Sequence, residues 1–121
     1  MSLETRTAFD IDAFKRGYEQ WDIDALLSLY ADDVEQIQLD DATPPSAPGV
    51  HRGKQRLEQM FRHCAGHGVK ATVENTVAGE HRAAATVTCE FPTGRRVVAN
   101  AILDLRDGKI VREHVTAARD E

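Results

Sequence analysis

Apolar side chains near the start of the chain recur with the period of an α-helix. From Thr7 or Asp10 onward, Phe14, Tyr18 and Trp21 follow one another at intervals of four and three residues, and most positions between them are polar. Side chains with this spacing lie on one face of a helix, so the pattern predicts a first amphipathic helix with a buried apolar face.

A second helix is predicted directly after the first. The carboxylate of Asp22 can accept hydrogen bonds from the free backbone N–H groups of the following turn, which is typical of a helix start. We expect the helix to end at the segment 31–33, Ala-Asp-Asp. Its buried stripe is predicted to consist of Ile23, Leu26, Leu27 and Tyr30.

The middle of the chain predicts a strand, a loop and a third helix. Residues 34–39 alternate glutamines with aliphatic residues, as strands do, whereas residues 41–49 contain three prolines and no regular period. Residues 53–64 return to helical spacing, and two glycines follow shortly afterwards, where the helix should end. The apolar face of this helix is predicted to consist of Leu57, Met60, Phe61 and Cys64.

Beyond Gly68 the apolar residues recur at every second position, which is the period of a β-strand. The pattern predicts a strand from Val69 through Glu74 before a turn near Gly79-Glu80, strands over 83–91 and 97–105, and a last strand over 109–118. Helices that precede such a series of strands indicate an α+β fold, in which the helices cover the apolar face of the sheet.

Length, composition and charge limit the classes of protein that this chain can represent. The 121 residues are 41% hydrophobic and 29% charged, which fits one core, so we treat residues 1–121 as a single domain. Residues 1–6 are expected to be disordered or to derive from a tag. The chain has 15 basic and 20 acidic side chains, and its net charge of -5 has the wrong sign for binding nucleic acid.

Neither a membrane segment nor a metal site is predicted. No apolar stretch reaches the roughly 20 residues of a membrane helix, and the first residues lack a signal-peptide profile, so we expect a cytoplasmic protein that does not bind membranes. Cys64 and Cys89 lie on the apolar sides of predicted elements and should be reduced core thiols. His63 and His67 are separated by Gly66, which should end their helix. No metal or other cofactor is therefore implied.

Two segments of the sequence resemble a known superfamily. Residues 21–33, WDIDALLSLYADD, and residues 103–111, LDLRDGKIV, look like the SnoaL-like and ketosteroid-isomerase branches of the nuclear transport factor 2 superfamily. With the order of the elements, the resemblance covers nearly the whole chain. It implies a cone-shaped α+β fold, in which a curved antiparallel or mixed sheet wraps over three N-terminal helices and encloses one internal pocket. These segments indicate the fold and not the chemistry.

The resemblance also locates the positions of the ketosteroid-isomerase machinery. Those enzymes use an aspartate base together with a tyrosine and a protonated aspartic acid. Here the base position falls on Gln38, the tyrosine position falls on Phe14, and the acid falls near Ala101. Because none of these side chains can do the corresponding chemistry, steroid isomerisation by that set of groups is disfavoured.

The turn before the last strand decides which side chains of that strand face the pocket, because a shift of one residue reverses every later side chain. A two-residue turn at Asp107-Gly108 would place Arg112 and His114 beside Ala101. A three-residue loop over 106–108 is favoured, because it aligns the apolar residues of the last strand with those of the strand before it and agrees with the resemblance. In this register the residues of the last strand on the pocket face are Val111, Glu113, Val115 and Ala117.

Under the favoured register, Glu113 is predicted to act as the general acid or base, because burial between valines would raise its pKa. Asp40, at the pocket rim, is the second choice. In the other register Glu113 faces solvent or a partner subunit and pairs with an arginine such as Arg112 or Arg96. The predicted ligand-binding residues are Phe14, Tyr18, Tyr30, Gln36, Gln38, Met60, Phe61, Cys64, Val87, Cys89, Ala101 and Val115, although an apolar stripe of this kind also fits a filled core.

Three functions remain open from the sequence. The first is a small-molecule-binding SnoaL-like domain for an apolar ligand with a ring or a carbonyl group, with or without cofactor-independent isomerase, cyclase or hydrolase chemistry through Glu113. The second is a pocket that binds its ligand without chemistry, and the third is a protein-interaction module. A homodimer is expected, because outward faces of the strands carry Ile37, Leu39, Val98 and Ile102.

Overall fold

Two short helices open the part of the chain that this computed structural model describes, residues 8–120. Helix α1 spans Ile11–Gln20, and the Asp10 side chain caps it by accepting a hydrogen bond from the Ala13 backbone N–H at 2.9 Å. Helix α2 spans Ile23–Ser28 and is capped by Asp22 in the same way. The expectations for residues 1–6, and a helix start at Thr7, lie outside the described residues.

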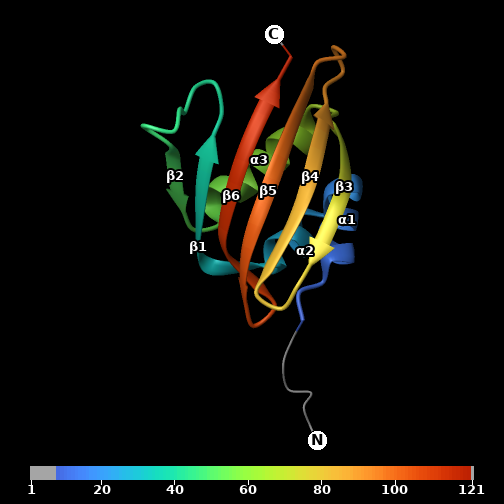
Figure 1. The fold of residues 1–121 in the computed structure, drawn as a ribbon. Helices are drawn as coiled ribbons and strands as arrows, with labels where there is room; N and C mark the ends of the chain where they lie inside the picture. Colours follow the sequence, from blue (N-terminus) through green and yellow to red (C-terminus); the bar gives the residue numbers. More distant parts are fainter. Residues whose placement is uncertain (1–7, 121) are drawn as a thin grey trace, which may run out of the picture.

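Six strands and a third helix complete the fold. The strands are β1 (Tyr30–Leu39), β2 (Gly49–Arg52), β3 (Lys70–Ala78), β4 (Arg82–Glu90), β5 (Arg96–Arg106) and β6 (Lys109–Arg119), and helix α3 is Gln55–Gly66. They form one sheet in the order β2-β1-β6-β5-β4-β3, in which β1 and β6 run parallel and the other pairs antiparallel. The three helices lie together behind the sheet in the view of Figure 1. The predicted α+β layering with a mixed sheet is confirmed.

The start of β1 differs from the prediction, which placed Tyr30 in the second helix and ended that helix at residues 31–33. Helix α2 ends at Ser28, and β1 begins at Tyr30, which pairs with Ile110 of β6. The Ile110 backbone N–H also donates to the Leu29 carbonyl at 2.8 Å. Pairing with a distant strand therefore overrides the helical spacing of the local sequence.

Two further boundaries were predicted incompletely. The segment 41–49 was predicted as loop alone, whereas its end, Gly49, begins the short strand β2, which pairs with the edge of β1. Helix α3 begins at Gln55 and ends at Gly66, two residues later at each end than the predicted helix over 53–64. Gly53 lies instead in the left-handed region, with φ of 85°, and turns the chain between β2 and α3.

The β5–β6 hairpin combines features of both predicted registers. Arg106 pairs with Lys109, so the connection is the two-residue turn Asp107-Gly108, whose φ angles of 54° and 77° fit a hairpin turn with left-handed central residues. The favoured three-residue loop was therefore wrong. An irregularity follows, because Leu105 pairs with Ile110 but Asp104 pairs with Arg112. The extra residue, Val111, is a β-bulge that reverses the later side chains, so Glu113 still faces inward.

The helices bury an aromatic core against the sheet. Phe14 and Phe61 have no exposed surface, and the Tyr18 ring packs edge-on against both, with ring centroids 5.1 and 5.4 Å apart. Leu26, from α2, and Leu103, from β5, are also fully buried. Within residues 8–120 no helix has both the length and the apolar composition needed to cross a bilayer.

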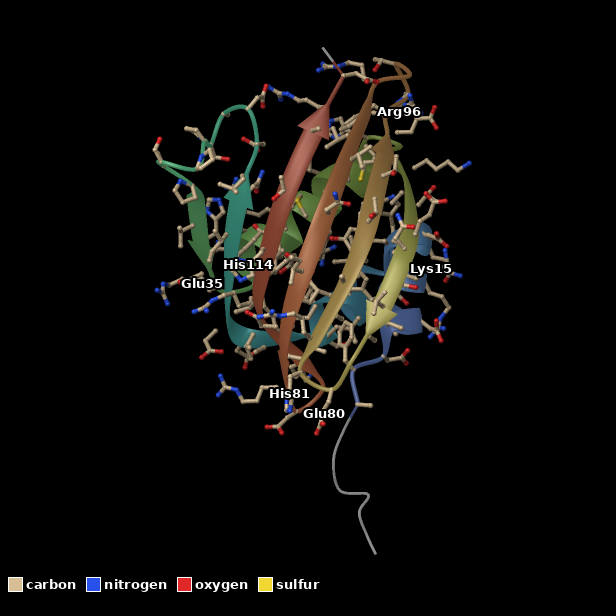
Figure 2. The ribbon with its side chains drawn as sticks, in the orientation of Figure 1. Lys15, Glu35, Glu80, His81, Arg96 and His114 are labelled. Atoms are coloured by element: carbon tan, nitrogen blue, oxygen red, sulfur yellow. The ribbon has the colours of Figure 1, made fainter. Side chains whose placement is uncertain are left out.

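Helix α1 is fixed to the free edge of β3 by polar side chains. The Lys15 ammonium donates to the Val73 carbonyl at 2.8 Å, and the Glu19 carboxylate accepts from the Val73 backbone N–H at 3.0 Å. The Trp21 indole donates to the Val69 carbonyl at 2.7 Å. Lys15 is labelled at this edge in Figure 2. These bonds satisfy backbone groups of β3, and of Val69 just before it, that have no further strand to pair with.

The contact between α1 and α2 gives a test of this packing. A Cβ at Gly17 would lie 2.7 Å from Leu26 Cγ, whereas a Cβ at Gly66, at the end of α3, meets nothing within 4 Å. We expect Gly17→Ala to lower the free energy of unfolding by about 1–3 kcal/mol, because the fully buried Leu26 must move. Gly66→Ala should leave it unchanged or raise it by up to about 1 kcal/mol. Urea denaturation of both variants measures this, and equal effects would contradict the packing.

Candidate functional site

A cavity of about 180 Å³ lies between the helices and the concave face of the sheet. Helices α1 and α3 supply one wall, and strands β1, β4, β5 and β6 supply the other. Most of the lining is apolar, with small alanines on β5 and β6 that leave space. The lining residues are Tyr18, Trp21, Gln36, Gln38, Met60, Cys64, Val87, Cys89, Phe91, Val97, Ala99, Ala101, Glu113, Val115 and Ala117.

Glu113 is the carboxyl side chain in this lining, and it is 2% exposed. Gln36 and Glu113 are paired residues on the parallel strands β1 and β6, and the Gln36 Nε2 donates to Glu113 Oε1 at 2.9 Å. The Tyr30 hydroxyl, at the start of β1, donates to Glu113 Oε2 at 3.1 Å. Each carboxyl oxygen therefore has one donor from β1, which holds the group in a fixed orientation.

Burial decides the protonation behaviour of this group. Removal from water raises the pKa of Glu113, and the hydrogen bonds from Gln36 and Tyr30 lower it only in part. A raised pKa moves a carboxyl toward the range in which it can both take up and release a proton near neutral pH. The predicted burial of Glu113 and the direction of its pKa shift agree with the structure. Its catalytic role stays a prediction.

Two tyrosines extend the network from Glu113 into the cavity. Burial, followed by the nearby Glu113 carboxyl, raises the pKa of both the Tyr18 and the Tyr30 phenol well above 10.0. Both therefore keep their protons across the physiological range. Because the Tyr30 proton goes to Glu113, the hydroxyl that can donate to a ligand oxygen in the cavity is that of Tyr18, which lines it.

Asp40, the second predicted acid or base, serves the β1–β2 connection. Its carboxylate accepts hydrogen bonds from the side chains of Gln38 and Thr43 and from the backbone N–H groups of Ala42 and Thr43. The Thr43 and Gln38 bonds hold the pKa of Asp40 below its ordinary value. Asp40 is absent from the described cavity lining, and we propose no proton transfer for it.

The two cysteines line the cavity from opposite walls, Cys64 from α3 and Cys89 from β4. Both are free thiols, as expected. Burial raises the pKa of Cys64, and burial together with Cys64 raises the pKa of Cys89 to about 11. Thiols of this kind hold little thiolate near neutral pH, so they act as apolar wall and not as nucleophiles.

Nine of the twelve predicted ligand-binding residues line the cavity, and three do not. Phe14 and Phe61 are fully buried in the aromatic core behind the wall, and Tyr30 reaches the cavity only through Glu113. The periodicity placed these side chains on the correct face of their elements, but it could not show that they are buried beneath the cavity wall. Of the lining residues left out of that prediction, Phe91, Val97, Ala99 and Ala117 share the face and alternation of predicted neighbours, and Trp21 ends the first helix stripe.

His114, the alternative to Glu113, lies on the outer face of the sheet. Its Nε2 is 3.5 Å from Asp104 Oδ2, and Figure 2 shows it near Glu35, which forms ion pairs with Arg52 and Arg112. Among residues 8–120 no cluster of three or more histidine, cysteine or acidic side chains has the geometry to hold a metal ion.

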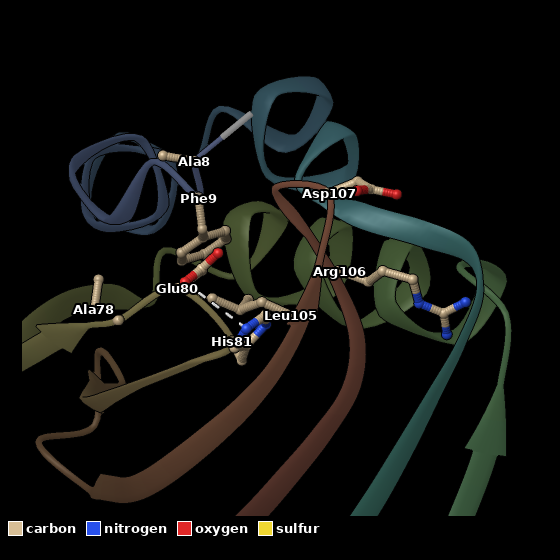
Figure 3. A pocket seen from close by; sticks show the side chains of 9 residues that line it. Ala8, Phe9, Ala78, Glu80, His81, Leu105, Arg106 and Asp107 are labelled. Carbon is tan, nitrogen blue, oxygen red and sulfur yellow. Dashed lines mark ion pairs between the residues drawn. The ribbon is translucent and has the colours of Figure 1, made fainter. Parts of the chain in front are cut away.

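A larger hollow, of about 500 Å³, lies at the opposite end of the sheet near the β5–β6 turn. Figure 3 shows Phe9 and Leu105 in its wall, with Glu80 and His81 forming an ion pair at 3.8 Å across its edge. None of its lining residues is a buried polar group, and it does not include Glu113. The smaller cavity therefore carries the candidate chemistry.

Comparison with known proteins places this geometry in a family. A family model described as "SnoaL-like domain" matches residues 11–113. No curated protein matches the sequence. Among solved structures, an NTF2-like protein of unknown function from Mesorhizobium loti is similar at 21% identity and a TM-score of 0.73, covering 88% of this chain and 86% of that one.

Two similar structures are described as enzymes. One is an LEH-like epoxide hydrolase from M. tuberculosis, at 18% identity and a TM-score of 0.64, covering 88% of this chain and 78% of that one. The other is the epoxide hydrolase/cyclase-like enzyme SalBIII of salinomycin pyran ring formation, at 19% identity and a TM-score of 0.65, covering 88% and 86%. At such identities the likeness establishes a shared fold and leaves the reaction open.

The raised pKa of Glu113 predicts how stability depends on pH. The folded protein holds this proton more tightly than the unfolded chain, so the stabilisation is complete below the ordinary value of 4.5 and is lost as pH rises through the raised pKa. Glu113→Gln removes this titration. Relative to the variant, wild-type protein should therefore lose unfolding free energy as the pH is raised from about 5 to about 8, as measured by urea denaturation.

Glu90→Gln, which removes an exposed carboxyl on β4, is the matched control for the change in charge. Its stability difference from wild type should vary much less between the two pH values. A difference between wild type and Glu113→Gln that is independent of pH would contradict the raised pKa of Glu113.

Proposed function

Because the chain belongs to the SnoaL-like domain family, we propose that it binds a small apolar molecule with a ring or a carbonyl group and moves a proton on it through Glu113, without a cofactor. The observation that carries this proposal is the position of Glu113. It is a nearly fully buried carboxyl group, held by Gln36 and Tyr30, in the lining of an otherwise apolar cavity.

The arrangement is suited to proton transfer next to a carbonyl group. A carboxylate offers about four lone-pair directions, and the bonds from Gln36 and Tyr30 leave positions on both oxygens for a substrate proton. With the substrate carbonyl near Tyr18, the C–H bond beside it breaks, Glu113 takes the proton, and the electrons move to the carbonyl oxygen. The Tyr18 hydroxyl stabilises that enolate, and return of the proton to the same or another carbon completes exchange or isomerisation.

Ligand binding without turnover is the second candidate. The same two hydrogen bonds favour this candidate. A carboxyl group whose two oxygens are already bonded can serve as a polar contact for a ligand without transferring a proton. The two candidates differ in whether a carbon-bound proton of the ligand is exchanged.

Proton exchange on a simple ketone tests the proposal directly. We expect the protein to accelerate deuterium uptake from D2O into 2-tetralone, a compact ring ketone, as followed by mass spectrometry. Glu113→Gln keeps the shape and removes the titrating group, so the catalysed rate should fall about a hundredfold or more. Asp40→Asn is the matched control and should retain the rate, because Asp40 serves the β1–β2 turn.

Binding of 2-tetralone with no catalysed exchange would favour the second candidate. Equal exchange by wild type and Glu113→Gln would remove Glu113 from the mechanism.

We further propose that the protein acts in the cytoplasm as a homodimer. Two free cysteines fit a reducing compartment. Val98 and Ile102, on the outer face of β5, are 40% and 46% exposed, and a second copy packed against this face would cover them. Analytical ultracentrifugation at micromolar concentration should therefore detect a dimer, and Ile102→Asp should shift it to monomer by placing two like charges at the interface.

Val77→Asp is the control, because Val77 is still more exposed but lies on the edge strand β3. It should leave the dimer intact. A wild-type protein that sediments only as monomer would contradict the homodimer.

A further inference from the structure

Basic side chains line two hollows that adjoin the end of the cavity away from Glu113. The cavity shares Phe91 and Val97 with an adjoining hollow of about 440 Å³, which is also lined by Arg95, Arg96 and Arg119. A second hollow of about 440 Å³ shares Arg95 and Arg119 and adds Asp41 and Asp120. We call this region the arginine rim. In Figure 1 it lies where the β4–β5 turn and the end of β6 meet.

The arginine rim and Glu113 lie on the same face of β6. Arg119 is six residues beyond Glu113, and because side chains alternate along a strand, an even separation keeps both on the concave face. Val115 and Ala117 lie between them and line the cavity. At the rise of a strand the separation is about 20 Å. One face of β6 thus runs from a carboxyl group, over small apolar residues, to a guanidinium group.

The charges at the rim are only partly neutralised. Arg119 donates to the Asp41 carboxylate at 3.0 and 3.2 Å, and Arg96 Nε is 4.0 Å from Asp120. The Arg95 guanidinium donates to the backbone carbonyl of Asp120, and within residues 8–120 it has no carboxylate partner. Among residues 8–120, three arginines and two aspartates line these two hollows, so the described lining carries more positive than negative side chains.

We propose that Arg95 and Arg119 bind the oxyanion of an elongated amphipathic ligand, whose apolar part lies in the cavity and points toward Glu113. A guanidinium group suits this role because its N–H groups form a planar fork that matches the oxygens of a carboxylate or a phosphate. The inference rests on the proposed function, since it describes the ligand of the same cavity. It assigns to that ligand a charged end, an apolar body and a reacting end.

The test compares probes that differ only in the head group. Decanoate, decyl phosphate and 1-decanol share one alkyl chain, and isothermal titration calorimetry measures the binding of each. In Arg95→Gln/Arg119→Gln the affinity for the preferred anionic probe should fall about tenfold or more, and the affinity for 1-decanol should change less than about twofold. Raising NaCl from about 20 to about 300 mM should weaken only the anionic probe.

Arg82→Gln/Arg106→Gln is the matched control, because it removes the same charge at the opposite end of β4 and β5. It should bind all three probes as wild type does, and thermal unfolding should show that both double variants remain folded. The two anionic probes distinguish a carboxylate from a phosphate as the preferred head group, and preference for either supports the proposal.

The inference and the proposed function can fail separately. If 1-decanol binds while neither anionic probe binds, or if the rim variant weakens all three probes equally, the arginine rim is not an anion site, although the cavity still binds ligands. If the rim variant has no effect on any probe, the inference is likewise overturned. If no probe binds, both the inference and the proposed cavity ligand are overturned.

Discussion

A carboxyl group inside an apolar interior must find hydrogen-bond donors, and much of this structure follows from that constraint. Within residues 8–120 the buried polar or charged side chains are Gln36 and Glu113, and they bond to each other. Removal of Glu113 would leave the buried Gln36 amide without this acceptor, and removal of Gln36 would leave Glu113 Oε1 without its donor, either of which is more costly than the bond itself is stabilising. The bond also joins β1 to β6, the parallel pair on which the mixed sheet depends.

Two irregularities bring these side chains together. The β1–β6 register shifts between Tyr30 and Glu35, and the β5–β6 register shifts at Val111. Without the second shift, the two-residue turn would direct His114 to the concave face and Glu113 to the outer one. Backbone irregularities next to a functional group are common, because they redirect a side chain without changing the rest of the strand. Here the redirected side chain is the candidate acid or base.

The sequence predicted the layering, the helices and the last strands, because their periods of 3.6 and 2 residues reflect burial on one face. It did not predict the extension of β1 back to Tyr30, since the tyrosine fits the α2 stripe equally well and only pairing with Ile110 distinguishes the two. Glu113 was placed inward from an incorrect turn, because alignment of apolar faces reports the final register and not how the chain reaches it. Depth was also beyond the pattern: Phe14 and Tyr18 share a helix face, yet only Tyr18 meets the cavity.

The side chains of α1 that hold β3 have a consequence for how copies of this protein can associate. A sheet whose outermost strand keeps free N–H and C=O groups can recruit another chain and grow sideways into fibres. Lys15 and Glu19 occupy such groups on β3, and Trp21 bonds to the Val69 carbonyl just before it. Asn75 breaks the regularity of β3 with a φ of 55°, and the opposite border, β2, has only four residues. Both borders are thus poor templates for lateral growth, and the broad face of the sheet is the larger surface open to a second copy of the chain.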